Sequence, residues 1–128
     1  MTHALQVVRD LLDAFSSVNM PRLRALLADN LRAFITNRTG DVDGVGADEY
    51  VARVEAMDLP SAEFSLEITQ AVAPRPDMVM VMVEVRARRG GRTLHNHAAH
   101  CLFVRDGLVH EWWMVEALPA ESDAFWSS

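Results

Sequence analysis

The sequence predicts a single α+β domain over residues 1–128, in which N-terminal helices pack in the concave face of a curved antiparallel sheet. Three observations predict this fold. Apolar residues recur at helical spacing in the first half of the chain, they alternate with polar residues in the second half, and two short turn signals fold that second half into a meander. A chain of 128 residues fits one domain with a sizeable core.

The first half of the chain predicts three helices. Residues 3–18 carry an apolar stripe at helical spacing, and Thr2 is placed to act as the N-cap. A short second helix begins at Pro21, because proline is tolerated in the first turn of a helix. Ala47–Met57 has one apolar face and predicts a third helix, which Pro60 ends.

Strands and loops are predicted for the chain between and after these helices. Residues 31–36 are strand-like, and the polar, glycine-rich stretch Asn37–Gly46 predicts a loop. Residues 64–72 alternate between apolar and polar side chains, as a half-buried strand does. A turn follows at residues 73–77, and Met78–Arg89 then forms a long strand.

The turn at Gly90-Gly91 decides which residues of its two flanking strands lie opposite each other. With two residues in this turn, Val81 lies opposite His100, and Asn96 shares their face. This face stays apolar along the strand, so we assign it to the concave, helix-covered side. His100 is then an imidazole in an apolar interior, where it needs a hydrogen-bonding partner.

The opposite, convex face of the sheet carries an apolar patch. Met80, Met82 and Cys101 lie on it, and Trp113 joins them in one register of the last strand. Monomers seldom expose that much contiguous apolar surface, so we predict a homodimer through this face. The alternative is that the C-terminal tail, residues 117–128, covers the patch.

Two further histidines, His95 and His97, lie on the convex face. His97 is beside Glu84 and His95 is beside Arg86, an arrangement typical of solvated polar pairs on a sheet. Two imidazoles two residues apart could bind a metal ion, but no third ligand follows at a useful spacing along the chain. The sequence therefore predicts no metal site and no cofactor.

The last strand has two registers that the pattern leaves open. A two-residue turn at Asp106-Gly107 places Trp113 and Glu111 inside. A three-residue loop with a glycine bulge instead places the first of the two adjacent tryptophans opposite His100. That second register sets four residues inward: His110, Trp112, Met114 and Glu116.

Composition excludes several classes of function. The net charge is −6, so nucleic acid, which needs a basic face, is not an expected partner. All twelve basic residues are arginine, so no lysine can act as a nucleophile or form a Schiff base. The apolar runs are too short to span a bilayer, which predicts no membrane partner. The single cysteine, Cys101, permits no internal disulfide, so we expect a cytoplasmic protein.

Four segments of the chain carry a resemblance to a known family: VRDLLDAFSSVNMPRLRALLADNL in the early helices, the RGGRTL turn, the AHCLFVRDGLVHEWW hairpin and the closing SDAFW. Together they resemble the SnoaL-like branch of the nuclear transport factor 2-like superfamily. The resemblance implies a cone-shaped half-barrel with a pocket between curved sheet and helices, usually dimerised through the sheet. Members of the family include polyketide cyclases, ketosteroid isomerases, limonene epoxide hydrolases, dehydratases and non-catalytic binding domains.

The resemblance also indicates which residues serve the pocket. His100 matches a histidine on the penultimate strand that lines the pocket of SnoaL-like cyclases, and this match favours the bulged register. The general base of those cyclases is an aspartate just after the last-strand tryptophan, where this chain has Met114. Because a thioether cannot take a proton, this departure argues against cyclase chemistry by that route.

We therefore predict a pocket for a small hydrophobic molecule, with His100 as the acid–base group and Glu116 as a second candidate base. The candidate ligand-binding residues are Asn37, Tyr50, Val81, Asn96, Trp112 and Met114. The corresponding reaction is proton transfer next to a carbonyl, in a cofactor-free isomerase, cyclase or dehydratase. The alternative is a non-catalytic module that binds an apolar ligand or a partner chain. The sequence does not decide between them.

Overall fold

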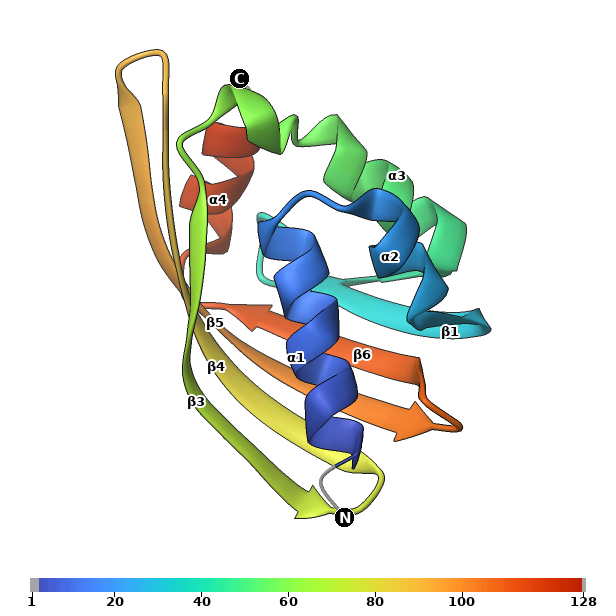
Figure 1. Ribbon diagram of the computed structural model, residues 1–128. Helices are drawn as coiled ribbons and strands as arrows, with labels where there is room; N and C mark the ends of the chain where they lie inside the picture. Colours follow the sequence, from blue (N-terminus) through green and yellow to red (C-terminus); the bar gives the residue numbers. More distant parts are fainter. Residues whose placement is uncertain (1–2, 128) are drawn as a thin grey trace.

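The computed structural model describes residues 3–127 and confirms the predicted α+β class, with the helices in the hollow of one curved, unclosed sheet (Figure 1). The helices are α1 (His3–Ser16), α2 (Met20–Ala25), α3 (Ala47–Ala56) and α4 (Pro119–Trp126), with a short 3₁₀ helix at Leu59–Ser61. The strands are β1 (Leu27–Thr36), β2 (Val42–Val45), β3 (Ser65–Arg75), β4 (Met78–Arg89), β5 (Arg92–Arg105) and β6 (Leu108–Glu116).

The six strands lie in the order β2-β1-β6-β5-β4-β3. Strands β3 to β6 form the antiparallel meander that the alternation and the turns predict. Two features of the sheet were not predicted: β1 pairs with β6 in parallel, and β2 pairs with β1. A parallel pair needs a long connection between its strands, so no short-range pattern in the sequence records it.

The stretch predicted as a loop at residues 37–46 is a tight hairpin that contains β2. The Asn37 backbone N–H donates to the Asp41 carbonyl (2.8 Å), and the Asn37 side-chain oxygen accepts from the Thr39 N–H (3.1 Å). Gly40 has a φ of +88°, which glycine adopts without steric cost. The polar composition hid the strand, because β2 is a short, largely exposed edge strand.

Several predicted boundaries shift by a few residues. α1 ends two residues earlier than predicted, and Val18 beyond it adopts a left-handed backbone (φ +57°). α2 starts one residue earlier than predicted, where the Asn19 side chain caps it by accepting from the Arg22 N–H (3.2 Å). β1 begins at Leu27 rather than at residue 31. The predicted N-cap of α1, Thr2, lies outside the described residues.

The Gly90-Gly91 turn has the predicted two residues, with φ of +60° and +78°. The predicted pairing follows: Val81 lies opposite His100, and the same register holds along the full length of the β4–β5 ladder. β4 has the predicted bounds. β3 continues to Arg75, into the turn predicted at residues 73–77. Arg75 pairs with Met78, the first residue of β4, so only two residues form the turn.

The β5–β6 hairpin combines features of both registers that the sequence left open. Asp106 and Gly107 have φ of +56° and +77°, so the turn itself is the two-residue form with both residues left-handed. Farther along, the pairing shifts by one residue between Phe103 and Val104. His110 is the extra residue of this β-bulge on β6.

The bulge decides which side chains of β6 enter the interior. Beyond it, Trp112 and Met114 are buried and Glu116 is half-buried, as the bulged register predicted. Trp112 lies opposite Leu102, however, and His100 lies opposite Met114. The prediction that Trp112 opposes His100 was therefore wrong by two residues, because the extra residue, His110, lies in β6 beyond a two-residue turn.

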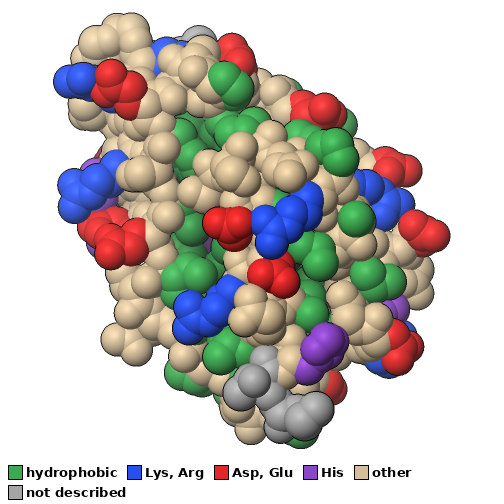
Figure 2. Space-filling model, viewed as in Figure 1, with side chains coloured by type: hydrophobic (Ala, Val, Ile, Leu, Met, Phe, Trp, Pro, Cys, Tyr) green, Lys and Arg blue, Asp and Glu red, His purple; other side chains and the backbone are tan. Residues whose placement is uncertain are grey.

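The core lies between α1 and the concave face of the sheet. Val8 and Leu11 of α1 are fully buried, as is Trp112 of β6. The tail that was expected to dock on the body forms α4, which packs on the concave side against β5 (Figure 1). On the helix-covered side, apolar side chains are interspersed with charged ones (Figure 2).

Candidate functional site

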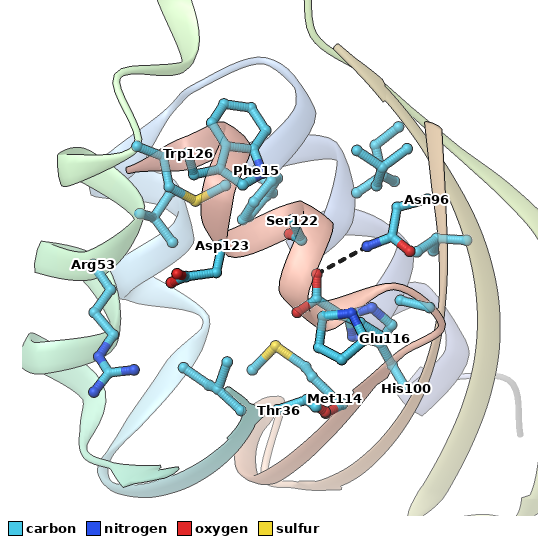
Figure 3. A pocket seen from close by; sticks show the side chains of 18 of the residues that line it. Phe15, Thr36, Arg53, Asn96, His100, Met114, Glu116, Ser122, Asp123 and Trp126 are labelled. Carbon is cyan, nitrogen blue, oxygen red and sulfur yellow. Dashed lines mark hydrogen bonds between the residues drawn. The ribbon is translucent and has the colours of Figure 1, made fainter. Parts of the chain in front are cut away.

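A cavity of about 290 Å³ lies between α1, α3, α4 and the concave face of the sheet. Its wall is mostly apolar and aromatic, and it includes Phe15, Tyr50, Phe64 and Trp126. Against this wall stand a few polar side chains, chiefly from β5, β6 and α4 (Figure 3). An apolar hollow with a small number of convergent polar groups is the usual form of a small-molecule site, and this volume is near the lower end of the usual range.

His100 lies in the wall of this cavity on β5, and its side chain is buried. The Trp112 indole Nε1 donates a hydrogen bond to His100 Nδ1 at 2.8 Å. Because an indole N–H can only donate, Nδ1 must accept, and the ring proton of the neutral imidazole is on Nε2. Burial lowers the pKa of His100 to about 4. The imidazole is therefore neutral near pH 7 and presents one donor, Nε2–H.

Glu116 also lines the cavity, and it lies two residues after Met114, which pairs with His100 across the β5–β6 ladder. The Asn96 amide donates to Glu116 Oε1 at 3.0 Å (Figure 3). Burial raises the pKa of the Glu116 carboxyl, hydrogen bonds from Ser122 and Asn96 partly oppose this, and the charge of Asp123 raises it further. A half-buried carboxyl with a raised pKa is a stronger base than a solvated one.

Asn96 orients Glu116 through a fixed amide. Its side-chain oxygen accepts from the Leu118 N–H (3.0 Å) and from the His97 N–H (2.9 Å). Backbone N–H groups can only donate, so the amide oxygen must face them and the NH₂ group must face Glu116. The amide is 3% exposed, and this network ties the start of α4 to the acidic group of the cavity.

Met114 and Tyr50 complete the wall near His100. Met114 faces the cavity opposite His100, and its carbonyl accepts from the Thr36 hydroxyl at 2.7 Å. The Tyr50 ring packs on Trp112 with centroids 4.8 Å apart. Burial raises the pKa of the Tyr50 hydroxyl, so it stays protonated and can only act as a neutral hydrogen-bonding group.

Asn37 lies at an edge of the cavity beside two charged residues. Its amide donates to Asp43 (3.2 Å), which also accepts from Arg53 (3.3 Å). The hydrogen bonds from Asn37 and Arg53 hold the pKa of the Asp43 carboxyl below its usual range. Asn37 therefore serves the turn and this ion pair, and a contact between it and a ligand stays a prediction.

The structure places most of the predicted site residues around one cavity, with Val81 as the exception. His100, Glu116, Asn96, Trp112, Met114, Tyr50 and Asn37 all line it. Val81 is 1% exposed and packs in the core, while Val83 and Val85 supply the β4 part of the wall.

Sequence reasoning missed several lining residues, including some from α4. Ser122, Asp123 and Trp126 line the cavity, and Ser122 hydrogen-bonds to Glu116. The signal for them was the closing SDAFW segment, which was expected to dock on the body without being assigned to the pocket. Its polar residues could have been matched to Glu116 only if the direction of the tail were known.

The comparisons with known proteins agree with this fold. A family model for the SnoaL-like domain matches residues 8–112. The chain belongs to the SnoaL-like family. No significant match was found among curated proteins.

Solved structures with the same fold share little sequence with this SnoaL-like chain. An NTF2-like protein of unknown function from Burkholderia pseudomallei has 20% identity, covers 100% of both chains and superposes with a TM-score of 0.79. IdmH from Streptomyces antibioticus, a proposed polyketide cyclase, has 18% identity over 89% of this chain and 91% of its own, with a TM-score of 0.76. A limonene-epoxide-hydrolase-like enzyme of Mycobacterium tuberculosis has 17% identity over 97% and 90%, also with a TM-score of 0.76. At these identities the likeness shows the fold alone.

Proposed function

We propose that this SnoaL-like protein binds a small, mostly apolar carbonyl compound and transfers a proton at the carbon next to the carbonyl, as an isomerase, cyclase or dehydratase does. The observation that carries the proposal is the pairing of Glu116, a half-buried carboxyl of raised pKa, with the neutral donor His100 in one apolar cavity. One base and one neutral donor are sufficient for this chemistry, so it needs no cofactor.

The hydrogen bond from Trp112 to His100 indicates different roles for His100 and Glu116. His100 was the first candidate for the acid–base group, but its pKa of about 4 makes it a weak base. We assign the base to Glu116 and the hydrogen-bond donor to His100. A neutral donor of this kind stabilises a developing oxyanion without giving up its proton.

The C–H bond next to the carbonyl breaks, and its proton passes to a Glu116 oxygen. The electron pair forms a carbon–carbon double bond, and the negative charge moves to the carbonyl oxygen, which accepts from His100 Nε2–H. Tyr50 is a second candidate donor to that oxygen. Return of the proton from Glu116 to another carbon completes an isomerisation, and the apolar wall strengthens each electrostatic contact.

Exchange of ketone α-hydrogens for deuterium tests the proposal. A panel of mono- and bicyclic ketones, sized for a cavity of about 290 Å³, is incubated with the protein in D₂O and followed by proton NMR. We expect catalysed exchange by the wild type and a loss of roughly 10²–10⁴-fold in Glu116→Gln. Glu84→Gln, on the convex face, is the matched control and should keep the full rate. Equal rates in Glu116→Gln and the wild type would exclude Glu116 as the base.

The alternative function is a non-catalytic module that holds an apolar ligand or a partner chain. Met114 supports it, because a thioether stands where SnoaL-like cyclases carry their base, and it lines the cavity. Apolar ligands would then bind to the wild type without any hydrogen exchange. Their affinity would also survive Glu116→Gln and His100→Gln, and fluorescence of the buried Trp112 can report that binding.

We also propose that two copies associate through the convex face. Met80, Met82 and Trp113 are 45%, 45% and 37% exposed there, and the Phe34 ring stacks on Trp113 with centroids 4.0 Å apart. Cys101 lies half-buried among them. Among the described residues the helices lie on the other face, so they leave this patch open. Sedimentation velocity tests the proposal, and a monomer at micromolar concentration would count against it.

The other expected partners and the location follow from charge and composition. A net charge of −6 does not favour nucleic acid. Within residues 3–127, no helix is long and apolar enough to cross a membrane. The single cysteine supports our proposal of a cytoplasmic location, which fractionation of expressing cells would test.

A further inference from the structure

A cluster of two histidines and one glutamate stands on the convex face of the sheet, away from the cavity. Glu84 of β4 and His95 and His97 of β5 offer ligand atoms that all lie within 4.8 Å of one another. His95 Nε2 is 2.5 Å from a Glu84 oxygen, and the two imidazole rings are 5.0 Å apart between centroids.

The sheet register assembles this cluster. His95 and His97 share a face because side chains alternate along β5. Glu84 pairs directly with His97, and Arg86 pairs with His95. The sequence predicted no metal site because no third ligand follows the two histidines at a useful spacing along the chain. The third ligand comes instead from the neighbouring strand.

We propose that Glu84, His95 and His97 bind a divalent transition-metal ion, with Zn²⁺ as the representative. Imidazole nitrogen and carboxylate oxygen bind Zn²⁺ at about 2.0–2.2 Å, so three ligand atoms of a tetrahedral site lie ~3.3 Å apart. In the present structure the ligand atoms all lie within 4.8 Å of one another, and His95 Nε2 is already 2.5 Å from Glu84, so binding needs rotation of the two exposed imidazoles around the ion. Water completes the coordination. Two imidazoles with one carboxylate favour Zn²⁺, Cu²⁺ or Ni²⁺ over Mg²⁺ and Ca²⁺, which prefer oxygen ligands.

The charges around the cluster act in opposite directions. Arg86 lies 3.2 Å from Glu84 and competes with a cation for that carboxylate. Glu67 on β3 pairs with Glu84 from the other side and adds an exposed carboxylate beside the half-buried one of Glu84. Arg86 is 61% exposed on its side chain and can turn to solvent when an ion binds. Removal of its charge should therefore tighten binding.

This site is separate from the proposed proton transfer. The side chains of His95 and His97 lie on the face of β5 opposite to that of Asn96, which donates to Glu116 in the cavity, although His97 also borders the cavity. An ion at this position joins β4 to β5 on the convex side and contributes no group to the cavity. The inference therefore stands whether or not the protein catalyses a reaction.

Isothermal titration calorimetry of the untagged protein with ZnCl₂, in a buffer that does not coordinate metal, tests this site. We expect one saturable site per chain with a dissociation constant in the micromolar range, and no comparable binding of Mg²⁺. The double variant His95→Ala/His97→Ala should weaken binding at least tenfold, and Glu84→Gln should also weaken it. Arg86→Gln should bind more tightly than the wild type.

The matched control is His110→Ala, which removes a half-buried imidazole from the bulge of β6 and should leave the affinity unchanged. Circular dichroism melts establish that each variant is folded before titration. Absence of saturable binding to the wild type would overturn the proposal. It would also be overturned if the double variant kept the wild-type affinity, or if His110→Ala lost as much affinity as the double variant.

Discussion

Histidines on the two faces of the sheet lie in opposite environments. His97 and His100 are three residues apart on β5, yet His97 is exposed on the convex face and His100 is buried on the concave face. His100 accepts a hydrogen bond from Trp112, and burial lowers its pKa to about 4. His97 stands beside Glu84 and His95 in contact with solvent.

The pleat of β5, rather than the residue type, therefore determines whether a histidine on this strand is buried in the cavity wall or exposed to solvent. Inward polar groups are few and mutually hydrogen-bonded, because an unpaired polar group in an apolar cavity is costly. The outward histidines are exposed and bonded only to other surface groups, so they can turn to an ion.

The largest difference is expected between the two adjacent tryptophans. Trp112→Ala removes a fully buried indole and leaves a cavity, so the free energy of unfolding should fall by ~3–5 kcal/mol. Trp113→Ala removes a side chain that is 37% exposed and stacks on Phe34, so its cost should be ~1 kcal/mol. Urea unfolding of both variants at one protein concentration measures the difference. Equal costs would contradict the assignment of one tryptophan to each face.

That pair also shows where sequence reasoning reached its limit. Adjacent residues must face opposite ways, so one inward tryptophan was certain, but which one depended on a single extra residue. The turn at Asp106-Gly107 has the two residues that its left-handed preference favours. The bulge at His110 then reverses the faces of the rest of β6. Since a bulge of this type needs no glycine or proline, nothing in the local sequence marks it.

The concave face of β5, in contrast, followed directly from the sequence. The two-residue turn at Gly90-Gly91 fixed the pairing, and with it the inward positions of His100 and Asn96. The partners of these groups could not be predicted in the same way. Ser122 arrives on α4 from a tail whose path is set by packing, and the donor to His100 depended on the register of β6.

The second largest effect is the pH dependence of stability that His100 causes. Its pKa is about 4 in the folded chain and about 6.5 when unfolded, so the unfolded chain takes up the proton first as pH falls. The resulting stability is present above pH 6.5 and is lost as the pH falls toward 4, by up to ~3 kcal/mol. Urea unfolding of the wild type and His100→Gln between pH 7 and 4 measures it.

Two comparisons isolate this contribution. The raised pKa of Glu116 acts in the opposite sense, but it is common to the wild type and His100→Gln and cancels in their difference. His97→Gln removes the exposed imidazole of the same strand and should keep the wild-type slope. An equally steep slope in His100→Gln would show that its imidazole is not the buried neutral group described above.

Asn96→Ala should cost less, and it separates structural from catalytic effects. It leaves the Leu118 N–H without its acceptor and removes one of the two side-chain hydrogen bonds to Glu116, so the free energy of unfolding should fall by ~1–3 kcal/mol. The pKa of Glu116 should rise further, because one hydrogen bond that holds it down is lost. The acid limb of the deuterium-exchange profile then moves to higher pH. Asn37→Ala, at the cavity edge, is the control that should leave this limb in place.

The smallest effect on folding is expected for Met82→Glu on the convex face. Met82 is 45% exposed, so within one chain a carboxylate there stays solvated and should change the free energy of unfolding by only ~0.5 kcal/mol. Association is different, because a second copy packed on this patch would bury the charge without a partner. Met82→Glu should therefore elute as a monomer from a sizing column, while Thr93→Glu, exposed near the hairpin tip, should elute as the wild type does. An unchanged elution volume for Met82→Glu would show that the convex face does not hold two copies together, and the exposed methionines would then need another explanation.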